Sequence, residues 1–268
     1  MTAVDLAGLG ARGLVVLGCG RMGSALLAGW IDRGLDASAV RVVEPAPSDW
    51  LRATGARLDG AMPEAPAVAL VAVKPQTMAD ALPALRGLGD PLVLTVAAGT
   101  PIAAYEAALG PDARVVRAMP NTPAAVGAGI TALVGNAAAT AADLDLAEAL
   151  MAAVGDVVRL DDEGQMDAVT GLSGSGPAYV FHLIEAMAAA GEAEGLAPAL
   201  ALRLARATVA GAGRLAVADD TAPSALREAV TSPNGTTQAG LEVLMAELPD
   251  LVRRTVARAA ARSRELRA

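Results

Sequence analysis

Short apolar runs alternate with helix-like segments over the first part of the chain, from Gly13 to about Leu160. The runs are continuously apolar, as expected for parallel strands that helices cover on both faces. They predict strands at residues 14–17, 40–43, 68–73, 92–96 and 115–118, and the first helix at residues 24–32. This strand–helix alternation is typical of a doubly wound parallel sheet.

The pattern changes at about Gln165, after which no strand-like run follows. Stretches rich in alanine and leucine, separated by Gly and Pro, predict helices at residues 177–191, 198–217, 222–230, 235–247 and 249–266. We therefore expect an α/β domain over residues 1–164 and an all-α domain over residues 165–268. So few bulky side chains in a helical domain bury little apolar area, which favours dimerisation through it.

Composition narrows the class of partners. The 268 residues carry a net charge of −8, with a sequence pI near 4.7, which argues against an electrostatic grip on nucleic acid or anionic lipid. Cys19 is the only cysteine, so an internal disulfide and a cysteine-based zinc site are both excluded, and we expect no metal.

We also expect a cytoplasmic protein without a signal peptide or a membrane span. The chain starts without a basic segment followed by an apolar one. Residues 118–142 are uncharged and long enough to cross a bilayer, but the start at residues 120–123, Pro-Asn-Thr-Pro, cannot satisfy its backbone in lipid.

A glycine-rich loop, Gly18-Cys19-Gly20-Arg21-Met22-Gly23, follows the first predicted strand and opens the first predicted helix. This is the context in which G-x-G-x-x-G binds a dinucleotide. Gly18 allows the tight turn, Gly20 lets a pyrophosphate approach the helix N-terminus, and Gly23 permits close packing of helix on strand. The loop predicts a dinucleotide-binding domain, with a tight turn that binds nothing as the alternative. We interpret Cys19 as a small filler.

Glu44 ends the second predicted strand, 21 residues after Gly23. A carboxylate there hydrogen-bonds the ribose 2′-hydroxyl and repels a 2′-phosphate. Arg41, Ser48 and Arg52 are close enough in sequence to form a phosphate site if Glu44 turns away. We therefore expect NADPH or NADH as the cofactor, with NADH preferred.

Two further strand ends are expected to line the same crevice, because ligands of such sheets bind at the carboxyl ends of the strands. Small residues let a nicotinamide ring approach the backbone, and Lys74 can meet phosphate or ribose oxygens, with a solvated strand end as its alternative. The candidate cofactor-binding residues are Gly18, Gly20, Arg21, Met22, Gly23, Glu44, Val73, Lys74, Pro75, Ala97, Ala98 and Asn121.

Three motifs in order, RAMPNTP at residues 117–123, DAVTGLSGSGPAY at 167–179 and SPNGTT at 232–237, resemble the pyrroline-5-carboxylate reductase family. With the glycine loop and the Val-Lys-Pro strand end, the resemblance spans nearly the whole chain. It implies NAD(P)H-dependent reduction of 1-pyrroline-5-carboxylate to L-proline, the last step of proline biosynthesis. It also implies a Rossmann domain and a helical domain that intertwines with a partner, hence a homodimer, in some members within a ring of dimers.

In that family the last threonine of the SPNGTT-like loop hydrogen-bonds the ring nitrogen of the substrate, which makes Thr237 the candidate catalytic residue. Because the loop opens a helix, its free backbone N–H groups can hold the substrate carboxylate, those of Thr236 and Thr237 above all. The alternative is a plain helix start with Ser232 as N-cap. Glu163 matches a family position that touches substrate, with a solvated glutamate as its alternative. The candidate substrate-binding residues are Glu163, Ser232, Gly235, Thr236 and Thr237.

Some positions depart from the family pattern. Asn234 replaces the first of two glycines, and asparagine tolerates the left-handed conformation better than other residues with side chains. Asp59-Gly60 stands where the family often has an asparagine that contacts the adenosine ribose, which leaves cofactor preference open. His182 has no role in the family pattern, so we expect it to pack or to form a simple hydrogen bond.

Two other functions fit the same domain order. A β-hydroxyacid dehydrogenase or imine reductase needs a lysine and an asparagine where this chain has Val180 and Ile184. A non-catalytic dinucleotide-binding protein of the same fold is the second alternative, and the intact loop around Thr237 argues against it.

Overall fold

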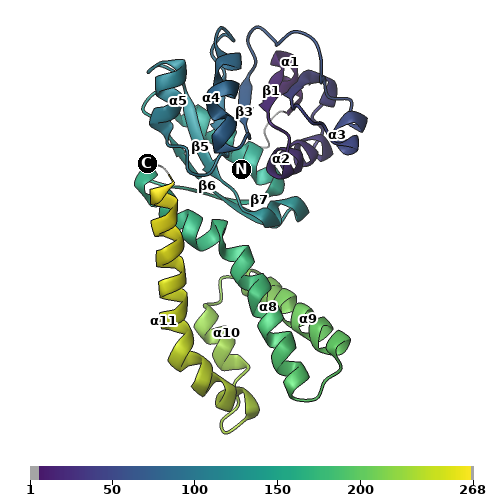
Figure 1. The fold of residues 1–268 in the computed structure, drawn as a ribbon, viewed down its shortest axis with the longest axis vertical. Coiled ribbons are helices and arrows are strands. Elements are labelled where there is room, and N and C mark those ends of the chain that lie inside the picture. Colours follow the sequence, from purple (N-terminus) through teal and green to yellow (C-terminus); the bar gives the residue numbers. More distant parts are fainter. Residues whose placement is uncertain (1–5, 267–268) are drawn as a thin grey trace. The chain divides into compact units, whose positions relative to one another are not determined.

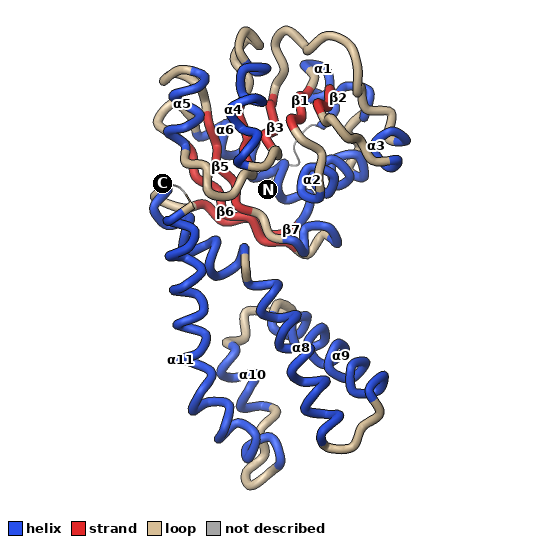
Figure 2. The backbone as a smooth tube through the Cα atoms, viewed as in Figure 1, coloured by secondary structure: helices blue, strands red, loops and turns tan. Residues whose placement is uncertain are grey.

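The structure is a computed structural model that describes residues 6–266. Its contacts divide the chain into two compact units. The first contains the residues up to Gly174 together with the C-terminal segment from Ala259, and the second contains Ser175–Arg258. Figure 2 shows all the strands in the first unit, whereas the second unit is built from helices.

The first unit is built on a seven-stranded sheet in the order β2-β1-β3-β4-β5-β6-β7 (Figure 1). The strands are β1 (Leu14–Leu17), β2 (Val40–Val43), β3 (Val68–Val71), β4 (Leu92–Thr95), β5 (Val115–Met119), β6 (Gly129–Gly135) and β7 (Gly155–Arg159). All five predicted strands are present. Strands β6 and β7 were not predicted from the sequence, and β6 makes the sheet mixed because it runs antiparallel to β5. The uncharged run at residues 118–142 thus supplies a sheet strand.

Helices cover both faces of this sheet. They are α1 (Leu6–Arg12), α2 (Arg21–Asp32), α3 (Asp49–Ala53), α4 (Met78–Ala81), α5 (Ile102–Leu109), α6 (Ala141–Met151) and α7 (Met166–Val169). Alternate strand residues point to opposite faces. Leu14 and Val16 therefore join a core with α2 and α6, and Val15 and Leu17 join another with α5. The result is a three-layer α/β unit.

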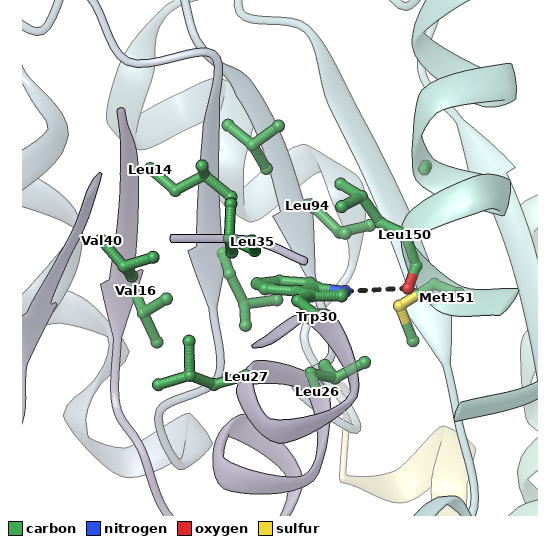
Figure 3. Close-up of a cluster of buried hydrophobic side chains, with 14 of the residues drawn as sticks. Leu14, Val16, Leu26, Leu27, Trp30, Leu35, Val40, Leu94, Leu150 and Met151 are labelled. Carbon is green, nitrogen blue, oxygen red and sulfur yellow. Dashed lines mark hydrogen bonds between the residues drawn. The ribbon is translucent and has the colours of Figure 1, made fainter. Parts of the chain in front are cut away.

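Trp30 is the largest fully buried side chain of the first core. Leu14, Val16, Leu26 and Leu27 surround its ring in Figure 3. The indole Nε1 donates to the backbone oxygen of Leu150 at 2.9 Å, which ties α2 to α6.

Residues 165–174 pack with the sheet unit, so the division of the chain lies beyond the predicted boundary at residue 164. Met166 is fully buried against the α5 side of the sheet. The C-terminal turns of the last helix join the same unit, where Ser263 Oγ donates to Asp167 Oδ1 at 2.7 Å in a buried hydrogen bond. Burial of these side chains, which the local sequence pattern does not encode, decides where the unit ends.

The second unit consists of α8 (Gly176–Ala193), α9 (Pro198–Ala216), α10 (Pro223–Ala229) and most of α11 (Thr236–Glu265). The predicted break at residue 248 is wrong, because α11 continues through Pro249. A proline inside a helix removes one backbone hydrogen bond and crowds the preceding turn, but helices tolerate it with a kink.

Large apolar side chains remain exposed on this unit, among them Phe181, Leu183, Val243, Leu244, Leu251 and Val252. Apolar surface of this extent marks an interface, in keeping with the expected dimerisation. Within residues 6–266 the structure contains no helix with the length and apolarity needed to cross a membrane.

Candidate active site

A pocket of about 590 Å³ opens at the carboxyl ends of β1, β2 and β3. Strand β1 lies between β2 and β3, so the chain winds in opposite directions from it, and ligands of doubly wound sheets bind at this switch point. Gly18, Gly20, Glu44, Val73 and Lys74 all line the pocket. The structure therefore brings these predicted cofactor residues together.

The glycine loop has the geometry that its sequence predicts. Gly18 has a φ of +83°, and a Cβ there would lie 2.9 Å from the carbonyl carbon of Ala72. A Cβ on Gly23 would lie 2.5 Å from the backbone oxygen of Gly18. At Gly20, by contrast, no heavy atom of the described residues lies within 4 Å of a Cβ position. The loop is therefore closed toward the protein and open on the pocket side.

Helix α2 starts at Arg21 with Gly20 as N-cap, and no side chain of the described residues caps it. Its first turn contains no acidic residue. The backbone N–H groups of that turn are thus free for an anion, and the helix dipole favours a negative charge there. This arrangement can hold the pyrophosphate of a dinucleotide.

Glu44 is fixed by two backbone donors. Its Oε2 accepts from Cys19 N at 2.8 Å, and its Oε1 accepts from Ala46 N at 3.0 Å. Arg41 is also engaged by backbone, since its Nη1 donates to the carbonyl oxygens of Val42 and Leu58 at 2.6 and 2.5 Å. The negative charge is therefore held at the pocket, and Arg41, one of the candidate phosphate ligands, has other partners.

Cys19 is buried within the loop, with its Sγ 3.5 Å from Ser24 Oγ. Burial raises the pKa of the thiol. A thiol that keeps its proton is a poor nucleophile, in keeping with its interpretation as a filler.

The other predicted cofactor residues lie outside this pocket. Arg21, Met22 and Gly23 form the first turn of α2, and Pro75 begins the turn after Lys74. Ala97 and Ala98 lie in the loop after β4, where Ala97 N donates to Thr95 Oγ1 at 3.3 Å. The side chain of Asn121 is internally bonded, because its Nδ2 donates to Ser173 O at 3.2 Å and its Oδ1 accepts from Ile130 N at 3.0 Å.

Glu163 has two internal hydrogen-bond partners that its sequence position does not predict. Its Oε1 accepts from Arg117 Nη1 at 2.5 Å and from Ile102 N at 3.0 Å. The Arg117 side chain is 1% exposed, and that of Glu163 is 26% exposed. Its solvated-surface alternative is therefore wrong, while the substrate contact stays a prediction. The sequence feature that could have predicted this ion pair is a charged residue, Arg117, in an otherwise apolar strand.

The loop at residues 232–237 belongs to the second unit. Asn234 adopts a φ of +59°, as expected for the residue that replaces a glycine, and its backbone N–H donates to Gln238 Oε1 at 2.8 Å. Helix α11 begins only at Thr236, so Ser232 is not its cap. Thr237 is exposed, and within the described chain its hydroxyl forms no hydrogen bond, which leaves it free for a ligand.

His182 lies on α8 with a side chain that is 82% exposed. Its Nδ1 lies 3.0 Å from Glu185 Oε2, one helical turn away. The expectation of a simple hydrogen bond is confirmed.

Comparisons with known proteins agree with this architecture. The family profile described as pyrroline-5-carboxylate reductase dimerisation matches residues 163–266, and the profile described as NADP oxidoreductase coenzyme F420-dependent matches residues 13–99. A pyrroline-5-carboxylate reductase from Pseudomonas aeruginosa is 40% identical over 94% of this chain and 96% of its own length. One from Methanosarcina acetivorans is 40% identical over 93% and 96%.

Solved structures give the same result for the fold. The pyrroline-5-carboxylate reductase of Coxiella burnetii superposes with a TM-score of 0.90 at 33% identity, covering 96% of this chain and 99% of its own. The Plasmodium falciparum enzyme, solved with NADP bound, gives 0.80 at 26% identity, covering 96% and 98%. The predicted fold class is confirmed, and the helical domain is a dimerisation domain. The chain is an oxidoreductase that belongs to the pyrroline-5-carboxylate reductase family.

Proposed function

We propose that this protein reduces 1-pyrroline-5-carboxylate to L-proline with NADH as the preferred cofactor and Thr237 as the catalytic residue. The single observation that carries the cofactor part is the pocket at the switch point of the sheet, into which Gly20 and Glu44 face. Membership of the reductase family supports the choice of substrate. The substrate is a small anionic cyclic imine.

The reaction needs positioning more than a strong acid. A cyclic imine is electrophilic and takes up a proton on nitrogen readily near neutral pH. A reduced nicotinamide held at the pocket would supply the hydride for the imine carbon, and the protonated nitrogen would end as the secondary amine of proline. Holding the two reactants together is then the main contribution of the protein.

The start of α11 supplies the groups for the substrate. The hydroxyl of Thr237 is exposed and unbonded within the described chain, so it is free to hydrogen-bond the ring nitrogen. The backbone N–H groups of Thr236 and Thr237 lie in the first turn of a 30-residue helix. Such groups lack intrahelical acceptors and hold a carboxylate well. Ser232 and Gly235 shape the loop, since Gly235 N donates to Ser232 O at 3.0 Å.

The preference for NADH follows from how Glu44 is held. Two charge-assisted hydrogen bonds keep its carboxylate at the pocket. A 2′-phosphate placed there meets a like charge, and Glu44 must break both hydrogen bonds to turn away. The ribose 2′-hydroxyl of NADH, in contrast, can donate to the carboxylate.

The first experiment follows loss of the reduced-nicotinamide absorbance with NADH and NADPH in parallel, with and without 1-pyrroline-5-carboxylate. Fast loss that depends on substrate, with NADH favoured, is the expected result. If both cofactors bind and neither is consumed, the chain is a non-catalytic dinucleotide-binding protein. Oxidation of a β-hydroxyacid in place of imine reduction would favour the dehydrogenase alternative.

Variants test the two residue assignments separately. Glu44→Ser is expected to raise use of NADPH relative to NADH. Asp49 is an exposed carboxylate shortly after Glu44 in the sequence, and Asp49→Ser should leave this ratio unchanged. Thr237→Ala is expected to lower turnover and leave cofactor binding intact. Thr236→Ala keeps its backbone N–H and serves as the matched control. Unchanged turnover in Thr237→Ala would remove its hydroxyl from the mechanism.

The assembly and the cell compartment are further parts of the proposal. We expect the homodimer to associate into a ring of dimers, which light scattering of the purified protein tests directly. We also expect a cytoplasmic location, because a single cysteine suits a reducing compartment. Recovery of the native protein in a secreted or membrane fraction would contradict that expectation.

A further inference from the structure

The loop at residues 96–101 connects β4 to α5 and carries Ala97 and Ala98, which we expect beside the nicotinamide ring. Its start is held by hydroxyl groups. Ala97 N donates to Thr95 Oγ1, and Thr95 Oγ1 lies 2.5 Å from the hydroxyl of Tyr105 on α5. Both Thr95 and Tyr105 are fully buried. The first turn of the loop is thereby fixed to the helix that follows it.

The end of the loop is held by an ion pair from elsewhere in the sequence. Ile102 is the first residue of α5, and its N-cap, Pro101, offers no side-chain acceptor. Glu163, 61 residues further on, accepts from Ile102 N at 3.0 Å instead. A carboxylate at a helix N-terminus also interacts favourably with the helix dipole. Glu163 therefore acts as the missing cap of α5.

Arg117 fixes the position of that carboxylate. Its guanidinium is 1% exposed in β5 and lies 2.5 Å from Glu163 Oε1. Glu163 is the only carboxylate within ion-pair distance of Arg117 among residues 6–266. Removing one member of a buried pair leaves an uncompensated charge, which is strongly unfavourable. The pair therefore locks three segments together: β5, the segment at Glu163 and the end of the loop.

We propose that Arg117 and Glu163 are positioning residues for hydride transfer. The two side chains hold the loop at residues 96–101 in place, and this loop in turn positions the nicotinamide ring beside it. They act through the backbone N–H of Ile102, a role that requires neither side chain to touch a reactant. The inference rests on the proposed cofactor site. It differs from a substrate contact by Glu163, which would change the KM for the imine.

The test uses Glu163→Gln in the full-length protein. Glutamine keeps an acceptor for Ile102 N and removes the charge that holds Arg117. We expect kcat to fall by about 10- to 100-fold, because a misplacement of about 1 Å has that effect on a positioned reaction. The primary isotope effect measured with NADH deuterated at the transferred position is expected to rise. The Kd of ADP-ribose, which lacks nicotinamide, should stay within about twofold, since the helix N-terminus that binds pyrophosphate is untouched.

A matched control lies at the other end of the same strand. Arg114 precedes β5 and pairs with the buried Asp143 at 2.6 Å. Asp143→Asn weakens another ion pair of the same unit, in which Arg114 keeps Asp90 as a second partner. This variant is expected to lower the melting temperature while kcat and the isotope effect stay unchanged. If Glu163→Gln does not fold, the double variant Arg117→Met/Glu163→Gln removes both charges, and the same kinetic change is expected in it.

Several results would overturn the proposal. Unchanged kcat and isotope effect in the folded Glu163→Gln or double variant would do so. A rise in the KM for the imine alone would make Glu163 a substrate contact. Loss of ADP-ribose affinity in parallel with the melting temperature would make the pair merely structural. Failure of the wild-type protein to bind ADP-ribose would instead refute the cofactor site on which the inference rests.

Discussion

Alanine substitutions at two glycines of the same loop should separate stability from cofactor affinity, because one is expected to lower stability and the other to lower affinity. At Gly18 the φ of +83° is unfavourable for any residue with a side chain, and the added Cβ would lie 2.9 Å from the backbone of Ala72. At Gly20 the backbone is extended, with a φ of −71°, and no described atom lies within 4 Å of the added Cβ. Gly18→Ala therefore perturbs the protein itself, and Gly20→Ala perturbs only the space next to it.

The magnitudes follow from these contacts. For Gly18→Ala, left-handed backbone costs about 1–2 kcal/mol and overpacking about 1–3 kcal/mol, so we expect a loss of about 2–5 kcal/mol. In a unit of this size that lowers the melting temperature by roughly 4–20 °C. For Gly20→Ala, the poorer N-cap is offset by a less flexible unfolded chain, and the net change in stability is about zero. The methyl group in the pyrophosphate space should weaken NADH binding by about 5- to 150-fold.

Two measurements separate these outcomes. Thermal unfolding reports stability, and titration of nicotinamide fluorescence reports the Kd of NADH. We expect Gly18→Ala to have a lower melting temperature than the wild type. Gly20→Ala should keep the melting temperature of the wild type but bind NADH with a higher Kd. Wild-type NADH affinity in Gly20→Ala would show that the open side of the loop does not face the cofactor, and a wild-type melting curve for Gly18→Ala would refute the steric argument.

Three further predictions concern the core, the buried thiol and the exposed helical surface. Trp30→Phe loses the hydrogen bond to Leu150 O and part of the ring volume, so urea unfolding should show a loss of about 1–3 kcal/mol with the Kd of NADH unchanged; an unchanged midpoint would contradict this. Because burial raises the pKa of Cys19 from 9.0, the folded thiol keeps its proton where the unfolded one releases it. The free energy of unfolding should therefore fall more steeply above about pH 9 than in Cys19→Ala, and parallel profiles would refute the shift. Leu244→Asp places a charge on the exposed apolar surface of α11 and should shift the dimer toward monomer in light scattering, whereas Trp50→Asp in α3 should not.

Local patterns of apolar and glycine residues were sufficient to predict much of the first unit. The strands β1 to β5 are short, continuous apolar runs, and burial on both faces requires nothing else of them. The glycine loop could likewise be predicted from the sequence, because the positive φ of Gly18 and the close approach of the Gly18 backbone to Gly23 exclude side chains at both positions. Asn234 in the left-handed conformation follows from the same local reasoning.

Other elements were missed because their strand character depends on their neighbours. Strand β6 reads as an uncharged run with glycines and alanines, and it becomes a strand by pairing antiparallel with β5. Strand β7 lies at the sheet edge with three of its five residues exposed, so it carries no apolar pattern. Pro249 predicted a helix end, but α11 continues through it.

The sequence by itself determined the fold class, the family and five of the residues that line the pocket, because these depend on periodicity and on motifs of adjacent residues. The tertiary structure alone decided which charges meet. Glu44 holds Cys19 N from 25 positions away, and Arg117 pairs with Glu163 across 46 positions. Such contacts depend on which strands are neighbours and which face each side chain takes. Those are properties of the whole sheet, and no local stretch of sequence contains them.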